Sequence, residues 1–178
     1  MEGTALSGGD ETLRENQHQM IYLTRRAEFS ASHYYHSPAL SPEENKRLYG
    51  KCNNPHGHGH NYVLEVTVRG EVDGRSGMVV DLKQLKEVLH CEVLDVLDHR
   101  FLNEEVPVFR HLIPTTENLA VEIWRMLAPK LAFCELHRIR LYETPDLYAD
   151  YFGPEDGPAV AKDIAGPSLS RRAGTCSG

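Results

Sequence analysis

The sequence lacks the features that mark membrane proteins, secreted proteins and proteins that bind nucleic acid. No apolar run approaches the length of a membrane span, and residues 1–19 are polar and acidic, without the order of a secretory signal. Positive charge is not in excess, because 26 Asp and Glu outnumber 19 Lys and Arg and give a formal net charge of −7. We therefore expect a cytoplasmic protein with neither nucleic acid nor a membrane as its partner.

Cysteine is scarce as well. The four cysteines lie far apart in the sequence and form no CxxC pair: Cys52, Cys91, Cys134 and Cys176. In a cytoplasmic protein, this spacing favours free thiols over a disulfide framework.

Length and composition bound the domain organisation. A chain of 178 residues with 40% hydrophobic content can bury one ordinary core, so we expect one domain. The first residues are rich in Gly, Glu and Gln, and the last are rich in Gly, Pro, Ala and Ser. We therefore expect a disordered lead over residues 1–19, a folded domain over residues 20–153 and a flexible tail over residues 154–178.

The most distinctive stretch contains three histidines that alternate with glycines. From Gly50 to Asn61 it reads Gly-Lys-Cys-Asn-Asn-Pro-His-Gly-His-Gly-His-Asn. Residues 62–69 follow with the strict apolar–polar alternation of a half-buried strand. Counting back by twos along that strand places His58 and His60 on its apolar face, pointing inward.

A second strand is predicted over residues 21–33, where an apolar alternation broken only by Arg25 ends at His33. If the two strands pair antiparallel, the end of the first lies beside the start of the second. The three histidines His33, His58 and His60 then converge. A single inward histidine is more often an ordinary core residue, but three that converge indicate a metal site, and zinc commonly binds imidazole nitrogen.

Other local signals complete the predicted element order. Ser41-Pro42-Glu43-Glu44 has the form of a capping box that begins a short helix ending near Gly50. Asp81 is expected to cap a helix that reaches Leu97, and a further helix begins near residues 114–117. Two more strands are predicted, over residues 136–143 and 147–152. Glu143 continues the inward alternation of its strand, which would bury a carboxylate that then needs partners.

These elements indicate an α+β fold. Four strands and two long helices in this order predict a four-stranded antiparallel sheet with both helices on one face. Such a sheet has two open edges, which proteins usually cover or pair with another chain. We therefore expect the protein to form oligomers.

Five motifs, in register from about Ile21 to Gly153, resemble the signature set of the 6-pyruvoyltetrahydropterin and 6-carboxytetrahydropterin synthase family. The motifs are Phe29–His33, Gly50–Asn61, Leu97–His99, Thr115–Asn118 and Tyr142–Thr144. The resemblance implies a tunnelling fold, in which four-stranded units close into a barrel through assembly, typically as a homohexamer of two trimers. It also implies a zinc-dependent lyase that converts 7,8-dihydroneopterin triphosphate to 6-pyruvoyltetrahydropterin and eliminates triphosphate.

The resemblance also implies roles for individual residues. His33, His58 and His60 match the zinc ligands, and three protein ligands leave a position open, as in catalytic zinc sites. Cys52 matches the proton-abstracting cysteine, and Asp98 and His99 match its partners in moving protons. The buried Glu143 would suit the N–H donors on one edge of a pterin. A segment of three residues matches one that lines the pterin pocket from a neighbouring subunit: Thr115, Thr116 and Glu117.

Two other functions stay open at this point. The first is 6-carboxytetrahydropterin synthase of the queuosine pathway, whose members commonly have three residues between the cysteine and the first His of His-x-His. This chain has five, Asn53 to Gly57, which favours the pyruvoyl branch. The second is a zinc-binding structural module without turnover, for which Cys52, Asp98, His99 and Glu143 would not be needed.

Overall fold

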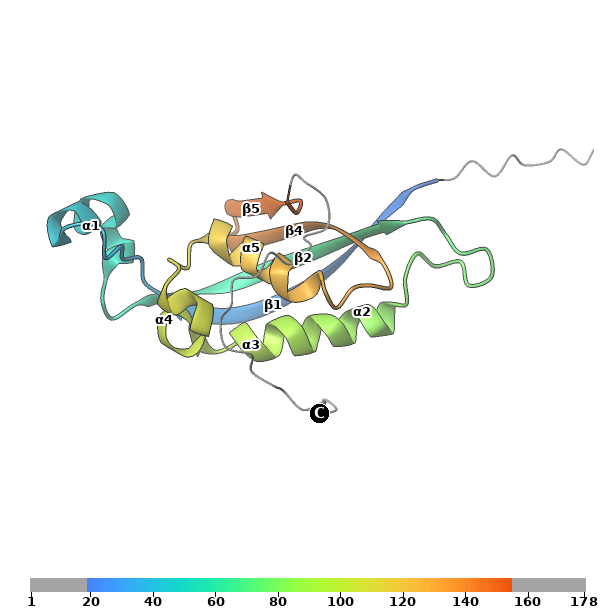
Figure 1. Cartoon of the computed structure of the whole chain (residues 1–178), viewed down its shortest axis with the longest axis horizontal. Coiled ribbons are helices and arrows are strands. Elements are labelled where there is room, and N and C mark those ends of the chain that lie inside the picture. Colours follow the sequence, from blue (N-terminus) through green and yellow to red (C-terminus); the bar gives the residue numbers. More distant parts are fainter. Residues whose placement is uncertain (1–18, 155–178) are drawn as a thin grey trace, which may run out of the picture.

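A computed structural model describes residues 19–154 (Figure 1). The predicted lead and tail lie almost wholly outside these residues. The described part follows the predicted order of major elements, with strands β1 and β2 first, helices in the middle and strands β4 and β5 last. The strands form one sheet in the order β3-β1-β2-β4-β5. Their bounds are Ile21–His33 for β1, His58–Gly70 for β2, Arg100–Phe101 for β3, Glu135–Thr144 for β4 and Leu147–Tyr151 for β5.

The sheet differs from the prediction by one strand. β1, β2, β4 and β5 pair antiparallel as expected, but β3 adds a fifth strand that runs parallel to β1 beside Ala31 and Ser32. The sheet is therefore five-stranded and mixed, and the prediction of a four-stranded antiparallel sheet is corrected. A strand of two residues is too short to produce a recognisable alternation of apolar and polar residues, which is why the sequence pattern missed it.

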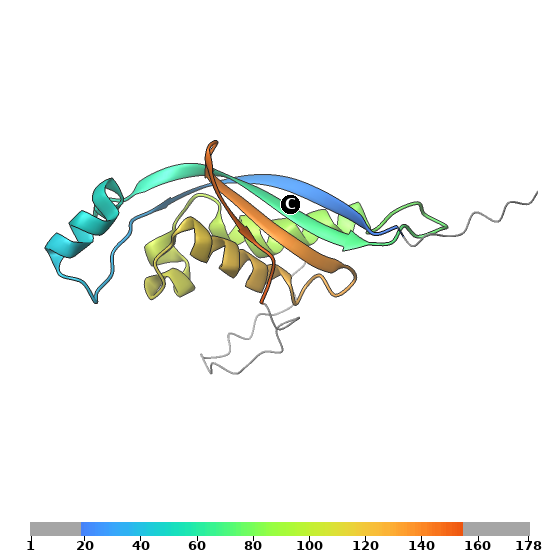
Figure 2. The ribbon, with the colours of Figure 1, turned by 90° about the horizontal axis from the view of Figure 1, so that it is seen from above.

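The helices are α1 (Pro42–Tyr49), α2 (Leu82–Leu89), α3 (Asp95–Leu97), α4 (Leu102–Glu105) and α5 (Thr116–Leu127). A π-helical turn over His90–Leu94 joins α2 to α3, so the single helix predicted from Asp81 to Leu97 is continuous but locally widened. Figure 2 shows α2 and α5 on the same face of the sheet, beneath the arch of β1 and β2, with α1 beyond the end of that arch. Among residues 19–154, no helix is long and apolar enough to cross a membrane.

Side-chain caps fix where three of these helices begin. Ser41 and Glu44 form the predicted capping box at α1. The Asp81 carboxylate accepts from the first backbone N–H groups of α2, and the Thr115 hydroxyl accepts from the N–H of Asn118 in α5. These bonds satisfy backbone donors that a helix leaves without partners at its first turn.

The core lies between the inward face of the sheet and the helices. Leu64 of β2, Leu141 of β4 and Ile123 of α5 are each fully buried, and burying such a side chain stabilises the fold by about 1.5–3 kcal/mol. The same inward face carries the histidines at the end of the sheet near α1. Packing in the middle of the sheet therefore holds the strand register that aligns them.

The cysteines are not all free. Cys52 and Cys134 are free thiols, as expected, whereas Cys91 is disulfide-bonded, which corrects the expectation for that residue. Cys91 lies in the π-helical turn, away from the histidine-bearing end of the sheet.

Candidate active site

Strand register brings the three predicted histidines together. β1 and β2 pair antiparallel so that His33 lies opposite His58 and Ala31 lies opposite His60. Nε2 of His33 is 3.2 Å from Nε2 of His58, and the ring centroid of His60 is 5.1 Å from that of His33 and 5.0 Å from that of His58. Each ring offers a nitrogen within 4.8 Å of the other two, so the cluster could hold one metal ion.

The surroundings of His33 leave its Nε2 available for a metal. Its Nδ1 lies 2.9 Å from the carbonyl oxygen of Pro114. A carbonyl oxygen only accepts, so Nδ1 carries the proton and Nε2 keeps its lone pair, which is the usual arrangement around a metal-binding histidine. Burial lowers the pKa of His33 to about 4 and lowers the pKa of His58 as well. Both imidazoles are therefore neutral at neutral pH, the form that binds metal.

Two buried nitrogens of the cluster have no hydrogen-bond partner among the described residues. They are Nδ1 of His58 and Nε2 of His60. A buried polar atom without a partner is costly. A metal bound by the cluster would satisfy Nε2 of His60 but not Nδ1 of His58, whose ring approaches His33 through Nε2. The three histidines therefore fit a metal ion on the chemistry of their donors and on the unpaired Nε2 of His60.

A buried carboxylate lies beside the cluster. Glu143 of β4 is 8% exposed, as its place in the strand alternation predicted. The hydroxyl of Thr116 makes a short hydrogen bond to its Oε2, and the hydroxyl of Tyr35 donates to the same oxygen at 3.1 Å. Its other oxygen, Oε1, lies 3.5 Å from Nε2 of His60. One carboxylate oxygen is thus held by two hydroxyls, while the other faces the histidines.

Cys52 lies on a 3₁₀ turn, Gly50–Asn53, that follows α1. Its thiol is free and half-buried, and its backbone carbonyl accepts from the N–H of Tyr35 at 2.8 Å. Burial, and then the negative charge of Glu143, raise the pKa of the Cys52 thiol. A thiolate here therefore depends on a cation nearby, which the histidine cluster could supply by holding a metal.

Asp98 and His99 occupy a different place. They precede β3, where Oδ1 of Asp98 accepts from the N–H of Ser30 at 2.8 Å and lies 2.9 Å from Nδ1 of His99. The N–H of His99 donates to the carbonyl of Ser30 at 2.6 Å, and His99 has a positive φ of 57°. The pair is thus fixed to the edge of β1, with the His99 side chain 82% exposed.

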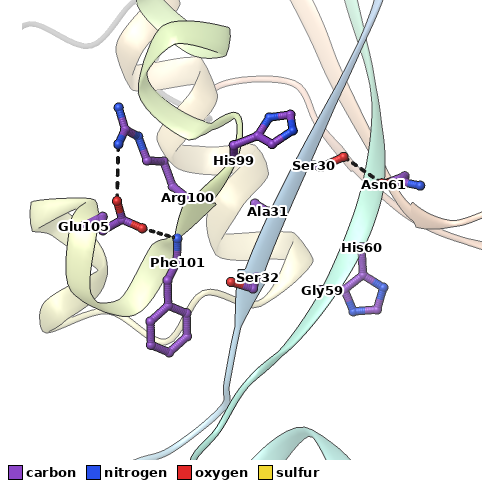
Figure 3. Close-up of a pocket in the computed structure, with 10 residues that line it drawn as sticks. All are labelled: Ser30, Ala31, Ser32, Gly59, His60, Asn61, His99, Arg100, Phe101 and Glu105. Carbon is purple, nitrogen blue, oxygen red and sulfur yellow. Dashed lines mark hydrogen bonds and ion pairs between the residues drawn. The ribbon is translucent and has the colours of Figure 1, made fainter.

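His99 borders a cavity of about 520 Å³ beside β1 and β2, which His60 of the histidine cluster also lines. Figure 3 shows His99, Arg100 and Phe101 on one side of this cavity and Ser30, Ser32 and Asn61 on the other. The charged group that affects the thiol of Cys52 is instead the carboxylate of Glu143, on the inward side. Within residues 19–154, no hydrogen bond, ion pair or charge interaction joins Asp98 or His99 to Cys52.

The three residues of the segment predicted to line the pocket have three different environments. Thr115 caps α5, Thr116 contacts Glu143 of the same chain, and Glu117 is exposed. A second copy is therefore not required for Thr116 to reach Glu143. The sequence reasoning missed Tyr35, although Tyr35 lies two residues beyond His33 and so continues the inward alternation of β1.

Fold and site together define a class, an α+β protein whose sheet carries a cluster of three histidines that could hold a metal, beside a buried carboxylate and a free thiol. Comparison with known proteins identifies the family. Residues 22–154 match the family model of 6-pyruvoyl tetrahydropterin synthase, and the chain belongs to this family.

Individual relatives agree with this assignment. The chain is 46% identical to 6-pyruvoyl tetrahydrobiopterin synthase of Drosophila melanogaster over 140 residues, which covers 78% of this chain and 83% of that protein. It is 47% identical to the protein of the same name from Homo sapiens over 131 residues, covering 74% and 90%. The solved structure of 6-pyruvoyl tetrahydropterin synthase from Caenorhabditis elegans superposes with a TM-score of 0.72 at 41% identity, covering 76% of this chain and 97% of that one.

Proposed function

We propose that the protein is a zinc-dependent lyase that converts 7,8-dihydroneopterin triphosphate to 6-pyruvoyltetrahydropterin and releases triphosphate. Relatives at 46% and 47% identity carry the name of this activity. The observation that carries the proposal is the convergence of His33, His58 and His60 beside Glu143. A metal site next to a carboxylate that could accept pterin N–H groups is what this reaction requires of its pocket.

Zinc is the metal that the donor set suits best. Two nitrogen ligands of one tetrahedral zinc ion are about 3.3 Å apart, close to the 3.2 Å between the Nε2 atoms of His33 and His58. Three histidines would hold the ion and leave a fourth position open. When bound, zinc supplies a Lewis acid that stabilises negative charge on an oxygen of the substrate.

The remaining roles fall to side chains of the protein. Glu143 would bind the pterin, because a carboxylate matches two adjacent N–H donors. Its Oε1 makes no hydrogen bond within the described part of the chain, and its one ion-pair contact there is the 3.5 Å approach to Nε2 of His60, so it can accept a hydrogen bond from the substrate. Cys52 would abstract the proton, since its thiol is close enough to Glu143 to feel its charge and a nearby cation favours the thiolate.

Asp98 and His99 would serve the Cys52 of a neighbouring copy. They are held at the edge of β1, where His99 borders a cavity. β3 pairs only with Ala31 and Ser32, so within residues 19–154 the outer edge of β1 before Ala31 has no partner strand. An open edge of this kind suits pairing with a second chain. We therefore include in the proposal a cytoplasmic homohexamer of two trimers whose sheets close into a barrel and whose pockets are shared.

Product identification tests this function. The zinc-loaded protein is incubated with 7,8-dihydroneopterin triphosphate, and the pterin product and released phosphate species are identified by mass spectrometry. The proposal expects 6-pyruvoyltetrahydropterin and one triphosphate for each substrate consumed. A 6-carboxy product would place the protein in the other branch of the family. No turnover by a protein that holds its zinc would instead favour a structural metal module.

A further inference from the structure

We propose that Tyr35 is a positioning residue for the pterin, acting through the carboxylate of Glu143. The inference rests on the proposed function, because it assigns to Tyr35 a part in the pterin binding assigned there to Glu143. Tyr35 lies in the segment between β1 and α1, two residues beyond His33. Its contacts join three parts of the pocket that are far apart in the sequence.

The first contact fixes the carboxylate. Tyr35 donates its hydroxyl to Oε2 of Glu143 at 3.1 Å, and the Thr116 hydroxyl donates to the same atom. A carboxylate oxygen has about two lone-pair sites, so these two hydroxyls saturate Oε2. Oε1 is left as the acceptor that faces His60. The two donors therefore decide which way the buried carboxylate turns.

The second set of contacts fixes Tyr35 itself. Its N–H donates to the carbonyl of Cys52 at 2.8 Å, and its carbonyl accepts from the side-chain amide of Asn53 at 2.7 Å. Its ring lies 4.8 Å from the ring of His33 and 5.9 Å from that of Tyr49, between centroids. Because the backbone and the ring of Tyr35 are both held, its hydroxyl is already in place at Glu143. Little side-chain freedom of Tyr35 is therefore lost when the pterin binds.

The two oxygens of Glu143 therefore have different roles, since Oε2 is held by the protein and Oε1 is left for the substrate. A buried carboxylate with only one donor on Oε2 could rotate and turn Oε1 away from the substrate. With two donors from different segments, its orientation is set before the pterin arrives, and preorganisation of this kind improves affinity. Tyr35 would therefore affect the binding of the pterin and leave the proton transfer at Cys52 unchanged.

The test is Tyr35→Phe, which removes one hydroxyl and keeps the ring and the backbone contacts. Neopterin, a fluorescent pterin without triphosphate, serves as the binding probe, and KM and kcat are measured with 7,8-dihydroneopterin triphosphate. We expect neopterin to bind about tenfold more weakly and KM to rise in parallel, as for the loss of a hydrogen bond to a charged group. The kcat and the zinc content are expected to stay as in the unmodified protein.

Tyr34→Phe is the matched control, because it removes the same atom from the adjacent residue. The hydroxyl of Tyr34 makes no hydrogen bond within residues 19–154, and its ring lies against Phe101 instead. This variant is expected to bind neopterin like the unmodified protein. A loss equal to that of Tyr35→Phe would show that the effect is not specific to Glu143, and would overturn the inference.

A double variant tests whether Tyr35 acts through the carboxylate. Thr116→Val removes the other hydroxyl from Oε2. Because the two hydroxyls hold one atom, losing both should weaken neopterin binding by more than the product of the two single losses. Simple multiplication of the single effects would contradict a shared action on Glu143.

Other results overturn the inference in distinguishable ways. Tighter neopterin binding by Tyr35→Phe would mean that the hydroxyl competes with the pterin for Oε2. A fall in zinc content would mean that Tyr35 supports the histidine cluster instead, and a fall in kcat at unchanged KM would place its role in the chemistry. If the unmodified, zinc-loaded protein binds no pterin at all, the proposed function fails before Tyr35 is tested.

Discussion

The inward and outward sides of the β1–β2 pair differ in how complete their sites are. On the inward side, the metal-binding cluster, Glu143 and Cys52 meet within one chain, and each has neighbours that fix it. On the outward side, Asp98 and His99 are fixed equally well to β1, but His99 is exposed beside an open cavity, and among residues 19–154 it makes no hydrogen bond or ion pair with Cys52. In the proposed function, the first site needs only a metal and a substrate, whereas the second also needs another copy.

The difference follows from how the two sides are built. Residues that alternate along paired strands share a face, so the histidine cluster forms when the register of β1 and β2 is correct, and the pairing of β4 with β2 adds Glu143 to the same face. The outward site depends on β3, a two-residue strand that holds Asp98 and His99 at the sheet edge. The comparison predicts that changes to the three histidines or to Glu143 affect zinc or pterin binding in any assembly state, whereas a change to Cys52 affects turnover. Changes on the outward side should affect turnover alone, and only through contact between copies.

The largest effect is expected from His58→Ala. This change removes one of three metal ligands, so the purified protein should lose most of its zinc, which should otherwise be about one ion per chain. Elemental analysis measures the content directly. His56→Ala is the control, because His56 is exposed and should keep the full amount. Full zinc retention by His58→Ala would rule out the cluster as the site.

Cys52→Ala should produce the next largest effect. Turnover is expected to fall by roughly 10²-fold or more, the usual scale for removing a positioned acid or base. Zinc content, assembly and neopterin affinity should stay nearly unchanged, because the three histidines already hold the metal. Cys134→Ala removes the other free thiol and should turn over substrate normally. If Cys52→Ala loses its zinc but keeps its rate per bound metal, Cys52 is a ligand and the assignment is wrong.

Asp98→Asn should reduce turnover less than Cys52→Ala does. An asparagine side chain still has an oxygen that can accept from the N–H of Ser30, so the edge of β1 is preserved while the charge beside His99 is lost. Steady-state kinetics measure the effect, and neopterin affinity should not change. Asp146→Asn is the control, since Asp146 is exposed and its carboxylate accepts a hydrogen bond from the hydroxyl of Thr144, well away from His99 in the sequence. Weaker pterin binding by Asp98→Asn would contradict the separation of the two sides.

The smallest effect is expected from Thr115→Ala. Thr115 caps α5, and losing such a cap costs about 1 kcal/mol of stability. Thermal unfolding should detect this loss, while neopterin affinity should remain that of the unmodified protein. Its neighbour Thr116 should behave in the opposite way, because Thr116→Val removes a hydrogen bond to Glu143. If Thr115→Ala and Thr116→Val weaken neopterin binding equally, Thr115 also contributes to the pocket and is not only a helix cap.

Much of this arrangement could be predicted from the sequence, because it depends on alternation. The inward positions of His33, His58 and Glu143 follow from counting by twos along strands that the apolar pattern defines clearly. The start of α1 followed from the capping box at Ser41. These features are local or need only one assumption about pairing.

Other features depend on contacts that no local pattern encodes. β3 is too short to show a period, and its parallel pairing with β1 is set by the positive φ of His99 and its bonds to Ser30. The contact of Tyr35 with Glu143 joins positions 108 residues apart. The resemblance to the family grouped Asp98 and His99 with Cys52, which one folded chain does not do. Sequence motifs identify which residues act together without saying whether one copy supplies them all.

Mixing two inactive variants tests the central claim most directly, that the inward site is complete in one chain and the outward pair serves another. Cys52→Ala and the double variant Asp98→Asn with His99→Ala are unfolded together, refolded with zinc and assayed for turnover. The account predicts that the mixture regains activity that neither variant has alone, because some pockets combine an intact Cys52 with an intact Asp98–His99 pair from a neighbour. A mixture of verified mixed assemblies that is no more active than its two components would contradict the account.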